Sequence, residues 1–130
     1  MKKYLVIILF SAICSLRVTV NAQNELWGMT QNGGANYLGV IFKIDTVNNT
    51  YTKVFDFDGT QNGEYPTGSL LQASNELVYG LASEGGANDF GVLFEYNCDS
   101  NTFTKKIDFD GVNNGKHPLG DLIQASNEKL

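Results

Sequence analysis

Carboxylate side chains gather in one short loop that occurs twice in the chain. The loop reads Asp-Phe-Asp-Gly at residues 56–59 and again at 108–111, and an Asn-Gly pair follows closely in both places. Calcium takes about six or more oxygen ligands, and alternating Asp residues before Gly and Asn can supply several of them. The candidate calcium ligands are Asp56, Asp58, Asp108 and Asp110. The pattern lacks the third spaced ligand and the distal Glu of an EF-hand, and Asp-Gly and Asn-Gly also form turns, so a purely structural turn is the alternative.

Aromatic side chains are the other candidates for chemistry. Flat apolar faces with polar edges suit stacking on sugars, so Tyr37 and Tyr65, in expected loops, are candidate ligand-binding residues. Trp27 and Tyr79 occupy equivalent repeat positions, which favours packing between repeats over a unique pocket. His117 is the only histidine, and no recognisable motif places a partner for general-base catalysis. We therefore expect His117 on a solvated loop and no catalytic residue.

All of these residues belong to two tandem copies of one segment with a period of 52 residues. Gly39, Phe42 and Pro66 each have an identical residue one period later, and whole segments such as Gly-Gly-Ala-Asn recur at the same offset. We place copy one at residues 26–77 and copy two at 78–129, within a repeat region that spans 23–130. Repetition argues against catalysis, because an active site is normally a unique constellation.

Each period contains four short apolar or alternating segments separated by turn residues, which predicts an antiparallel meander. In the central copy the predicted strands are 68–74, 77–82, 91–96 and 102–109. No segment after residue 22 has helical periodicity. A four-stranded meander that recurs at a fixed long period fits a β-propeller blade better than a sandwich. The expected fold class is all-β, with tandem four-stranded antiparallel meanders as propeller blades.

The phase of the repeat predicts an incomplete propeller. The chain holds about two blades, whereas propellers close with about four to eight. Copy one starts with the second strand of a blade, and residues 120–126 form a first strand with no blade of their own. This fits closure by the two ends or a chain cut from a longer array, and we expect truncation. We also expect further blades or self-association, with unpaired strand edges at 50–57 and 120–126.

The first 22 residues predict a signal peptide. Lys2 and Lys3 precede a short apolar stretch, and Val20-Asn21-Ala22 resembles a cleavage site. The apolar stretch is too short to cross a bilayer and is interrupted by Arg17, so we do not expect a transmembrane protein. The weaker alternatives are a buried core helix and lipid attachment at Cys14. The expected location is extracellular, cell-surface or periplasmic.

The mature part of the chain is acidic. Without Lys2, Lys3 and Arg17, six of the nine basic residues remain against fourteen acidic ones, so 6 − 14 gives a net charge of −8. Such a surface repels phosphate backbones and anionic lipid, which disfavours binding to nucleic acid or to a membrane surface. Cys98 is the only cysteine after the signal, so no disulfide framework is expected.

The repeat resembles a known family. Leu-Trp-Gly-Met-Thr at 26–30, the paired glycines 33–34 and the segment 39–45 are similar to the GloVer tandem repeat of exported bacterial proteins. The same motifs recur one period later, and the resemblance covers essentially all of the mature chain. More distantly, the paired glycines and the period are similar to kelch-type propeller repeats. The resemblance implies a surface location and a repeat architecture, and it brings no catalytic residues.

These observations predict an exported or cell-surface protein that acts as a non-catalytic binding or adhesion scaffold for a glycan or protein. One alternative is a propeller enzyme, a polysaccharide lyase or hydrolase, whose active site uses blades absent from this sequence. A purely structural spacer is the other alternative.

Overall fold

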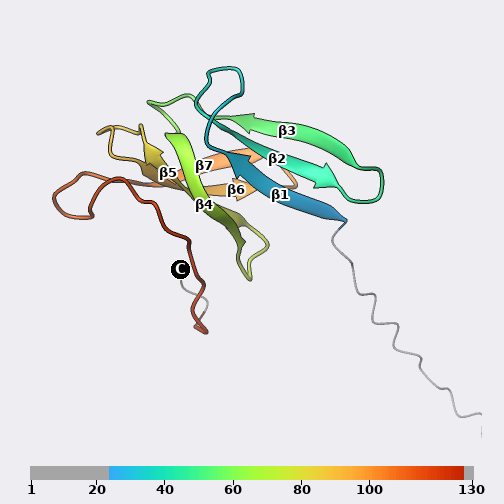
Figure 1. The fold of residues 1–130 in the computed structure, drawn as a ribbon. Helices are drawn as coiled ribbons and strands as arrows, with labels where there is room; N and C mark the ends of the chain where they lie inside the picture. Colours follow the sequence, from blue (N-terminus) through green and yellow to red (C-terminus); the bar gives the residue numbers. More distant parts are fainter. Residues whose placement is uncertain (1–23, 128–130) are drawn as a thin grey trace, which may run out of the picture.

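The computed structural model describes residues 24–127 as an all-β chain of seven strands in two antiparallel sheets (Figure 1). The first sheet contains, in spatial and chain order, β1 (Glu25–Thr30), β2 (Val40–Asp45) and β3 (Thr50–Asp56). The second sheet contains β4 (Glu64–Gln72), β5 (Val78–Glu84), β6 (Val92–Asn97) and β7 (Thr102–Asp108). The predicted tandem meanders are therefore confirmed. The predicted signal peptide at 1–22 lies outside the described residues.

The described residues contain no helix, in agreement with the absence of helical periodicity in the sequence. It follows that this part of the chain has no helix long and apolar enough to cross a membrane.

The predicted strand boundaries agree with the structure to within two residues except at the start of β4. This strand begins at Glu64, whereas the sequence predicts a start at residue 68. It begins early because Pro66 pairs with Ala82 and Thr67 pairs with Leu81 before the register shifts. Gly68 lies inside that irregularity and has a φ of +71°. It therefore forms part of a bulge within the strand and does not begin it.

The predicted strand at 120–126 is wrong. Residues 121–125 adopt no strand or turn, and the segment instead lies along β4, as the red end of the ribbon shows in Figure 1. Ser69 N–H donates to Asp121 Oδ1 at 2.6 Å, and Thr67 Oγ1 donates to the Pro118 carbonyl at 3.0 Å. A strand needs a neighbouring backbone to pair with, and no later strand is present in the described part of the chain. The other predicted edge is confirmed, because β3 is an outer strand of the first sheet.

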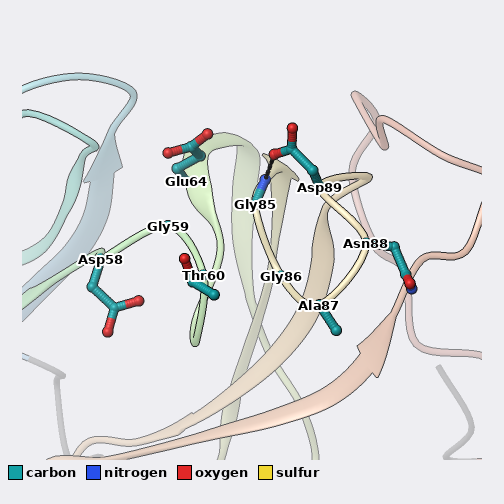
Figure 2. Close-up of a pocket in the computed structure, with 9 residues that line it drawn as sticks. All are labelled: Asp58, Gly59, Thr60, Glu64, Gly85, Gly86, Ala87, Asn88 and Asp89. Carbon is teal, nitrogen blue, oxygen red and sulfur yellow. Dashed lines mark hydrogen bonds between the residues drawn. The ribbon is translucent and has the colours of Figure 1, made fainter.

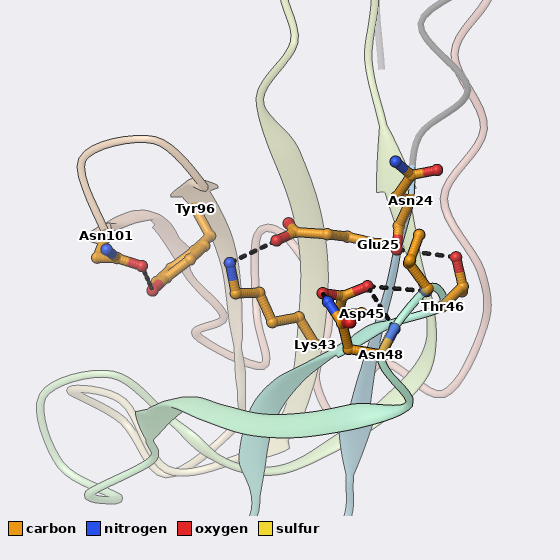
Figure 3. Close-up of polar contacts among 9 residues, drawn as sticks. Asn24, Glu25, Lys43, Asp45, Thr46, Asn48, Tyr96 and Asn101 are labelled. Atoms are coloured by element: carbon orange, nitrogen blue, oxygen red, sulfur yellow. Dashed lines mark hydrogen bonds and ion pairs between the residues drawn. The ribbon is translucent and has the colours of Figure 1, made fainter.

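The turns between the last two strands of each sheet are closed by one side chain. In the β2–β3 turn Asp45 Oδ1 accepts the N–H groups of Val47 and Asn48 (Figure 3). In the β6–β7 turn the equivalent residue, Asn97, accepts two backbone N–H groups through its own Oδ1. Either side chain can make this turn, because both carry an acceptor at the same distance from the backbone.

The unusual backbone positions also recur with the period. Tyr37 and Asp89 both have a φ of 62°, and Asn49 and Asn101 both have a φ of 52°. Left-handed backbone is uncommon outside glycine, so its recurrence at equivalent residues shows that both copies fold in the same way.

The main core lies where the two sheets pack against each other. The largest fully buried side chains come from both sheets and from the segment after β3: Tyr96, Phe57, Phe94, Ile41 and Val92. The ring of Phe55 stacks on Phe103 of the second sheet, with ring centroids 4.5 Å apart. Trp27 contacts Tyr96 at 6.0 Å between centroids, so it packs between repeats as its position predicted. Aromatic contacts therefore hold the two sheets together.

Candidate binding site between the two sheets

The first Asp of each Asp-Phe-Asp-Gly loop holds the glycine-rich loop of its own copy. Asp56 Oδ1 accepts the N–H of Ala35 at 2.7 Å, and its Oδ2 pairs with Lys53 at 2.7 Å. The Lys53 contact and this backbone hydrogen bond lower the pKa of Asp56. Asp108 makes the same contacts with Ala87 and Lys105 in the second copy, at 2.8 and 2.9 Å. Burial raises the pKa of Asp108, but these two contacts outweigh it, so that its pKa is lowered.

The second Asp of each loop closes a turn. Asp58 Oδ1 accepts the N–H groups of Gln61 and Asn62, and Asn62 Oδ1 accepts the Asp58 N–H at 2.7 Å. Asp110 makes the equivalent turn, and its pKa is lowered to about 2 by the Asn113 side chain and by backbone N–H groups. No group of three or more acidic, histidine or cysteine side chains that could hold a metal occurs among residues 24–127. The contacts are those of a structural turn, while calcium binding stays a prediction.

The loop after β3 is anchored so that it touches the second sheet. Phe57 is fully buried between the sheets, and Gly59 and Gly63 exchange two backbone hydrogen bonds of 3.0 Å. The Gly59 carbonyl then accepts the N–H of Gly86 at 2.8 Å. A Cβ at Gly85 would contact the Gly59 carbonyl oxygen, and the φ of Gly85 is +73°. Only glycine at this position allows the two loops to approach so closely.

These two loops enclose a pocket of about 440 Å³ (Figure 2). It is lined by Asp58, Gly59, Thr60, Glu64, Gly85, Gly86, Ala87, Asn88 and Asp89. Figure 2 shows Glu64 and Asp89 at the same end of the pocket, on either side of Gly85, whose N–H donates to Asp89 Oδ1 at 3.2 Å. Burial, followed by the charges of Asp89 and Glu84, raises the pKa of Glu64. The pocket is therefore polar and negative.

A protein-family model described as the Gloeobacter/Verrucomicrobia repeat matches residues 12–130, which is most of the chain. The chain belongs to this repeat family. The match confirms the resemblance to GloVer-type tandem repeats that the spaced glycine motifs indicated. The comparisons with curated proteins and with solved structures found no match.

Within this Gloeobacter/Verrucomicrobia repeat, the pocket combines a repeated frame with varied side chains. The glycines, Ala87, Asn88 and Asp58 all have identical residues one period away. The lining positions that differ are Thr60, Glu64 and Asp89, whose counterparts are Val112, Lys116 and Tyr37. The sequence prediction missed Glu64 and Asp89 as site residues. The signal that could have found them is this local difference inside otherwise repeated loops.

The aromatic candidates lie outside the pocket. Tyr37 is 79% exposed in the loop between β1 and β2, at the position equivalent to Asp89. Tyr65 lies half-buried in β4, where its N–H donates to the Leu38 carbonyl and its own carbonyl accepts the Ser83 hydroxyl. Neither tyrosine lines the pocket. His117 is exposed, as expected, and its Nδ1 lies 3.0 Å from the Ser83 carbonyl.

Proposed function

We propose that this chain is an exported, non-catalytic binding protein that holds a neutral or cationic polyhydroxylated ligand, such as a glycan segment, in the pocket between its sheets. The observation that carries the proposal is the pocket with its repeated frame and varied lining. Its volume of about 440 Å³ lies within the range of about 300–1,000 Å³ that is usual for small-molecule sites.

The chemistry of the lining supports this ligand class. The carboxylates of Asp58, Glu64 and Asp89 accept hydrogen bonds from hydroxyl or ammonium groups, and charge-assisted bonds of this kind are the stronger ones. Asn88 adds a side chain that can both donate and accept, although its Nδ2 already donates to the Phe109 carbonyl. The same carboxylates repel phosphate, sulfate and uronate groups, in keeping with the acidic mature chain.

Export and the absence of catalysis rest on the sequence. The residues at 1–22 have the order of a secretory signal, so N-terminal sequencing of the exported protein should find a start at Gln23. A binding role accounts for a loop frame that recurs with a varied lining, and the sequence contains no recognisable motif that places a catalytic base beside a nucleophile. The lyase or hydrolase alternative differs in its product, because an enzyme would shorten the polysaccharide that it contacts.

The experiment is an NMR titration of the full chain with a panel of neutral, amino-sugar and uronate-containing oligosaccharides. We expect the amide signals of Gly85 and Gly86 to shift with neutral or amino sugars and not with uronates. Asp89→Asn keeps an acceptor for the Gly85 N–H but removes the charge, and it should weaken binding about tenfold or more, because hydrogen bonds to charged groups contribute about 1.5–3 kcal/mol.

The matched control is Asp45→Asn, which removes one charge at a turn outside the pocket lining and should leave binding unchanged. The site would be refuted if the Gly85 and Gly86 amide signals shifted with no sugar. It would also be refuted if Asp89→Asn and Asp45→Asn bound the sugar equally well. Release of shortened oligosaccharide during the titration would favour the enzyme alternative.

A further inference from the structure

Among residues 24–127, one edge of the first sheet has no partner strand. In the second sheet β5 pairs with β4 on one side and with β6 on the other. The equivalent strand of the first sheet, β1, pairs only with β2 among the described residues. An unpaired strand edge offers a row of backbone donors and acceptors to any extended segment.

A cavity of about 190 Å³ lies along this open edge. It is lined by Glu25, Leu26 and Trp27 of β1 and by Leu70, Gln72 and Val78 from the second sheet. Leu26 is 60% exposed beside it. β1 and β4 are already in contact, so an added strand would pair with β1 on the side away from β2, next to the residues that line the cavity.

The same chain carries a segment that matches the missing strand. Residues 116–124 are one period after β4, with Pro118, Gly120 and Leu122 identical to their counterparts, yet the segment forms no strand. Leu119 and Ile123 are 72% and 79% exposed. The segment is fixed beside β4 by two hydrogen bonds. Thr67 donates to the Pro118 carbonyl, and the Ser69 N–H donates to Asp121. The segment is held in place beside β4 but forms no strand in the described part of the chain.

We propose that residues 116–124 of one molecule pair with β1 of a second copy of this chain and complete its first sheet. The pairing of β4 with β5 supplies the register. Residues 116–124 lie one period after β4, and β1 lies one period before β5. In that pairing Thr67 is opposite Leu81 and Leu71 is opposite Tyr79. Transferred by one period, Leu119 lies opposite Met29, Ile123 opposite Trp27 and Gln124 opposite Leu26 of the second copy.

The same placement also covers an exposed face of the second copy. Phe42 and Tyr51 stack with centroids 5.3 Å apart, and their counterparts Phe94 and Phe103 stack at 5.0 Å. The second pair is covered within the chain by Phe55, whereas Tyr51 is 55% exposed. Ile107, the counterpart of Phe55, is itself exposed. One head-to-tail arrangement therefore completes the sheet and packs Ile107 on Tyr51, repeating the contact between the two sheets of one molecule.

Such an interface is heterologous, so repeating it either closes a ring or extends a fibre. The described residues of one molecule supply two sheets, fewer than the about four to eight of a closed propeller. The arrangement is independent of the ligand proposed above, because the pocket is lined by residues of one molecule and shares none of them with the cavity beside β1.

The register is tested by disulfide cross-linking of the full chain in a background with both native cysteines replaced, Cys14→Ser and Cys98→Ser. We expect a mixture of Leu26→Cys and Gln124→Cys proteins to form a mixed disulfide dimer on mild oxidation, because paired strands bring Cα atoms within disulfide reach. Leu26→Cys mixed with Leu119→Cys is out of register and should yield at least fivefold less. Equal or absent yields in both mixtures would overturn the pairing.

The association itself is tested by sedimentation equilibrium. The unmodified chain should self-associate, and Ile123→Asp should weaken association about tenfold or more, because it places a charge against Trp27. Ile123 is exposed in the single chain, so this variant keeps its fold, which circular dichroism verifies. Val47→Asp, at an exposed apolar site in the β2–β3 turn, should associate like the unmodified chain. A monomer at about 100 µM, or association that Ile123→Asp leaves intact, would contradict the proposal.

Discussion

Single residues decide how closely neighbouring strands pack in both sheets. The ring of Phe94 lies against Gly80 of the adjacent strand, and the ring of Phe42 lies against Gly28 in the same way. A Cβ at Gly80 would contact the Phe94 ring directly, and a Cβ at Gly28 would lie 2.7 Å from the ring of Phe42. The glycines of strands β1 and β5 therefore provide space for an aromatic ring and do not mark a turn.

We predict that Gly80→Ala lowers the free energy of unfolding by about 1–3 kcal/mol, because a methyl group inserted against a fully buried ring forces the packing apart. Urea denaturation followed by circular dichroism measures the change. Gly120→Ala is the matched control, since nothing lies within 4 Å of a Cβ there and no positive φ is recorded. An equal loss in both variants would show that the ring contact is not the cause.

Glu64 gives the molecule a testable pH dependence. Its pKa is raised in the folded state, first by burial and then by Asp89 and Glu84, so folding is opposed once Glu64 ionises. That cost is absent below the ordinary pKa of 4.5 and grows as the pH rises through the raised folded value. Glu64→Gln should therefore melt at a higher temperature than the unmodified chain at about pH 7, with the difference lost near pH 3.5. A lower melting temperature at pH 7 would contradict this.

The residue scale also shows the limit of sequence reading. The turn-forming role of Asp58 and Asp110 follows from local sequence, because the groups that each carboxylate accepts lie within four residues. The presence of Glu64 and Asp89 in one pocket does not follow from local sequence. It depends on two loops that are brought together by the burial of Phe57 and by the close contact at Gly85.

At the scale of elements, each copy uses a carboxylate at the end of its last strand to fix a distant loop. Asp56 at the end of β3 reaches the loop between β1 and β2, and Asp108 at the end of β7 reaches the loop between β5 and β6. The second of these loops forms one wall of the pocket. The shape of the binding site therefore depends on a residue that does not line it.

We predict that Asp108→Ala increases the amide exchange rate of Ala87 about fivefold, because the N–H loses its acceptor at a net loss of about 1 kcal/mol. The fold should persist, and ligand binding in the pocket should weaken with the loop. Lys105→Met removes the ion pair but keeps the backbone hydrogen bond, so it should change exchange little, as a partly exposed ion pair contributes about 0–1 kcal/mol. Unchanged exchange at Ala87 in Asp108→Ala would refute this.

Strands were predicted correctly where the residue pattern within the strand determines it. The prediction failed where the presence of a neighbouring strand determines whether a segment is extended. Alternation in β6 places Val92, Phe94 and Tyr96 on one buried face, which the sequence already shows. Residues 120–126 carry nearly the same sequence as part of β4, yet in the described part of the chain a following strand is present for β4 alone. The early start of β4 was missed for the same reason, since Pro66 and Thr67 are set by β5.

At the scale of the whole molecule, the two sheets share one core and should unfold together. Phe57 is fully buried and contacts Phe55, Phe94 and Phe103, which lie in both sheets. Neither sheet buries its inner face without the other.

We predict that Phe57→Ala lowers the free energy of unfolding by about 3–5 kcal/mol. Phe57→Leu should lose less than half as much. The fluorescence of Trp27, the only tryptophan, reports on the first sheet, and circular dichroism reports on both. The two unfolding curves should coincide in the unmodified chain. A separate, earlier fluorescence transition would show that the first sheet unfolds independently.

The pocket lies where the two sheets of one molecule meet, and this position has a consequence for polymeric ligands. In the proposed head-to-tail arrangement an equivalent site would form between two molecules. It would join Asp110, Val112 and Lys116 of one molecule to the loop of Tyr37 in its neighbour. Acidic and mixed basic-aromatic sites would then alternate around one rim. A long chain molecule with two kinds of unit would be held by avidity, gaining about 10²–10⁴ over a single site only when the spacing of its units matches that alternation.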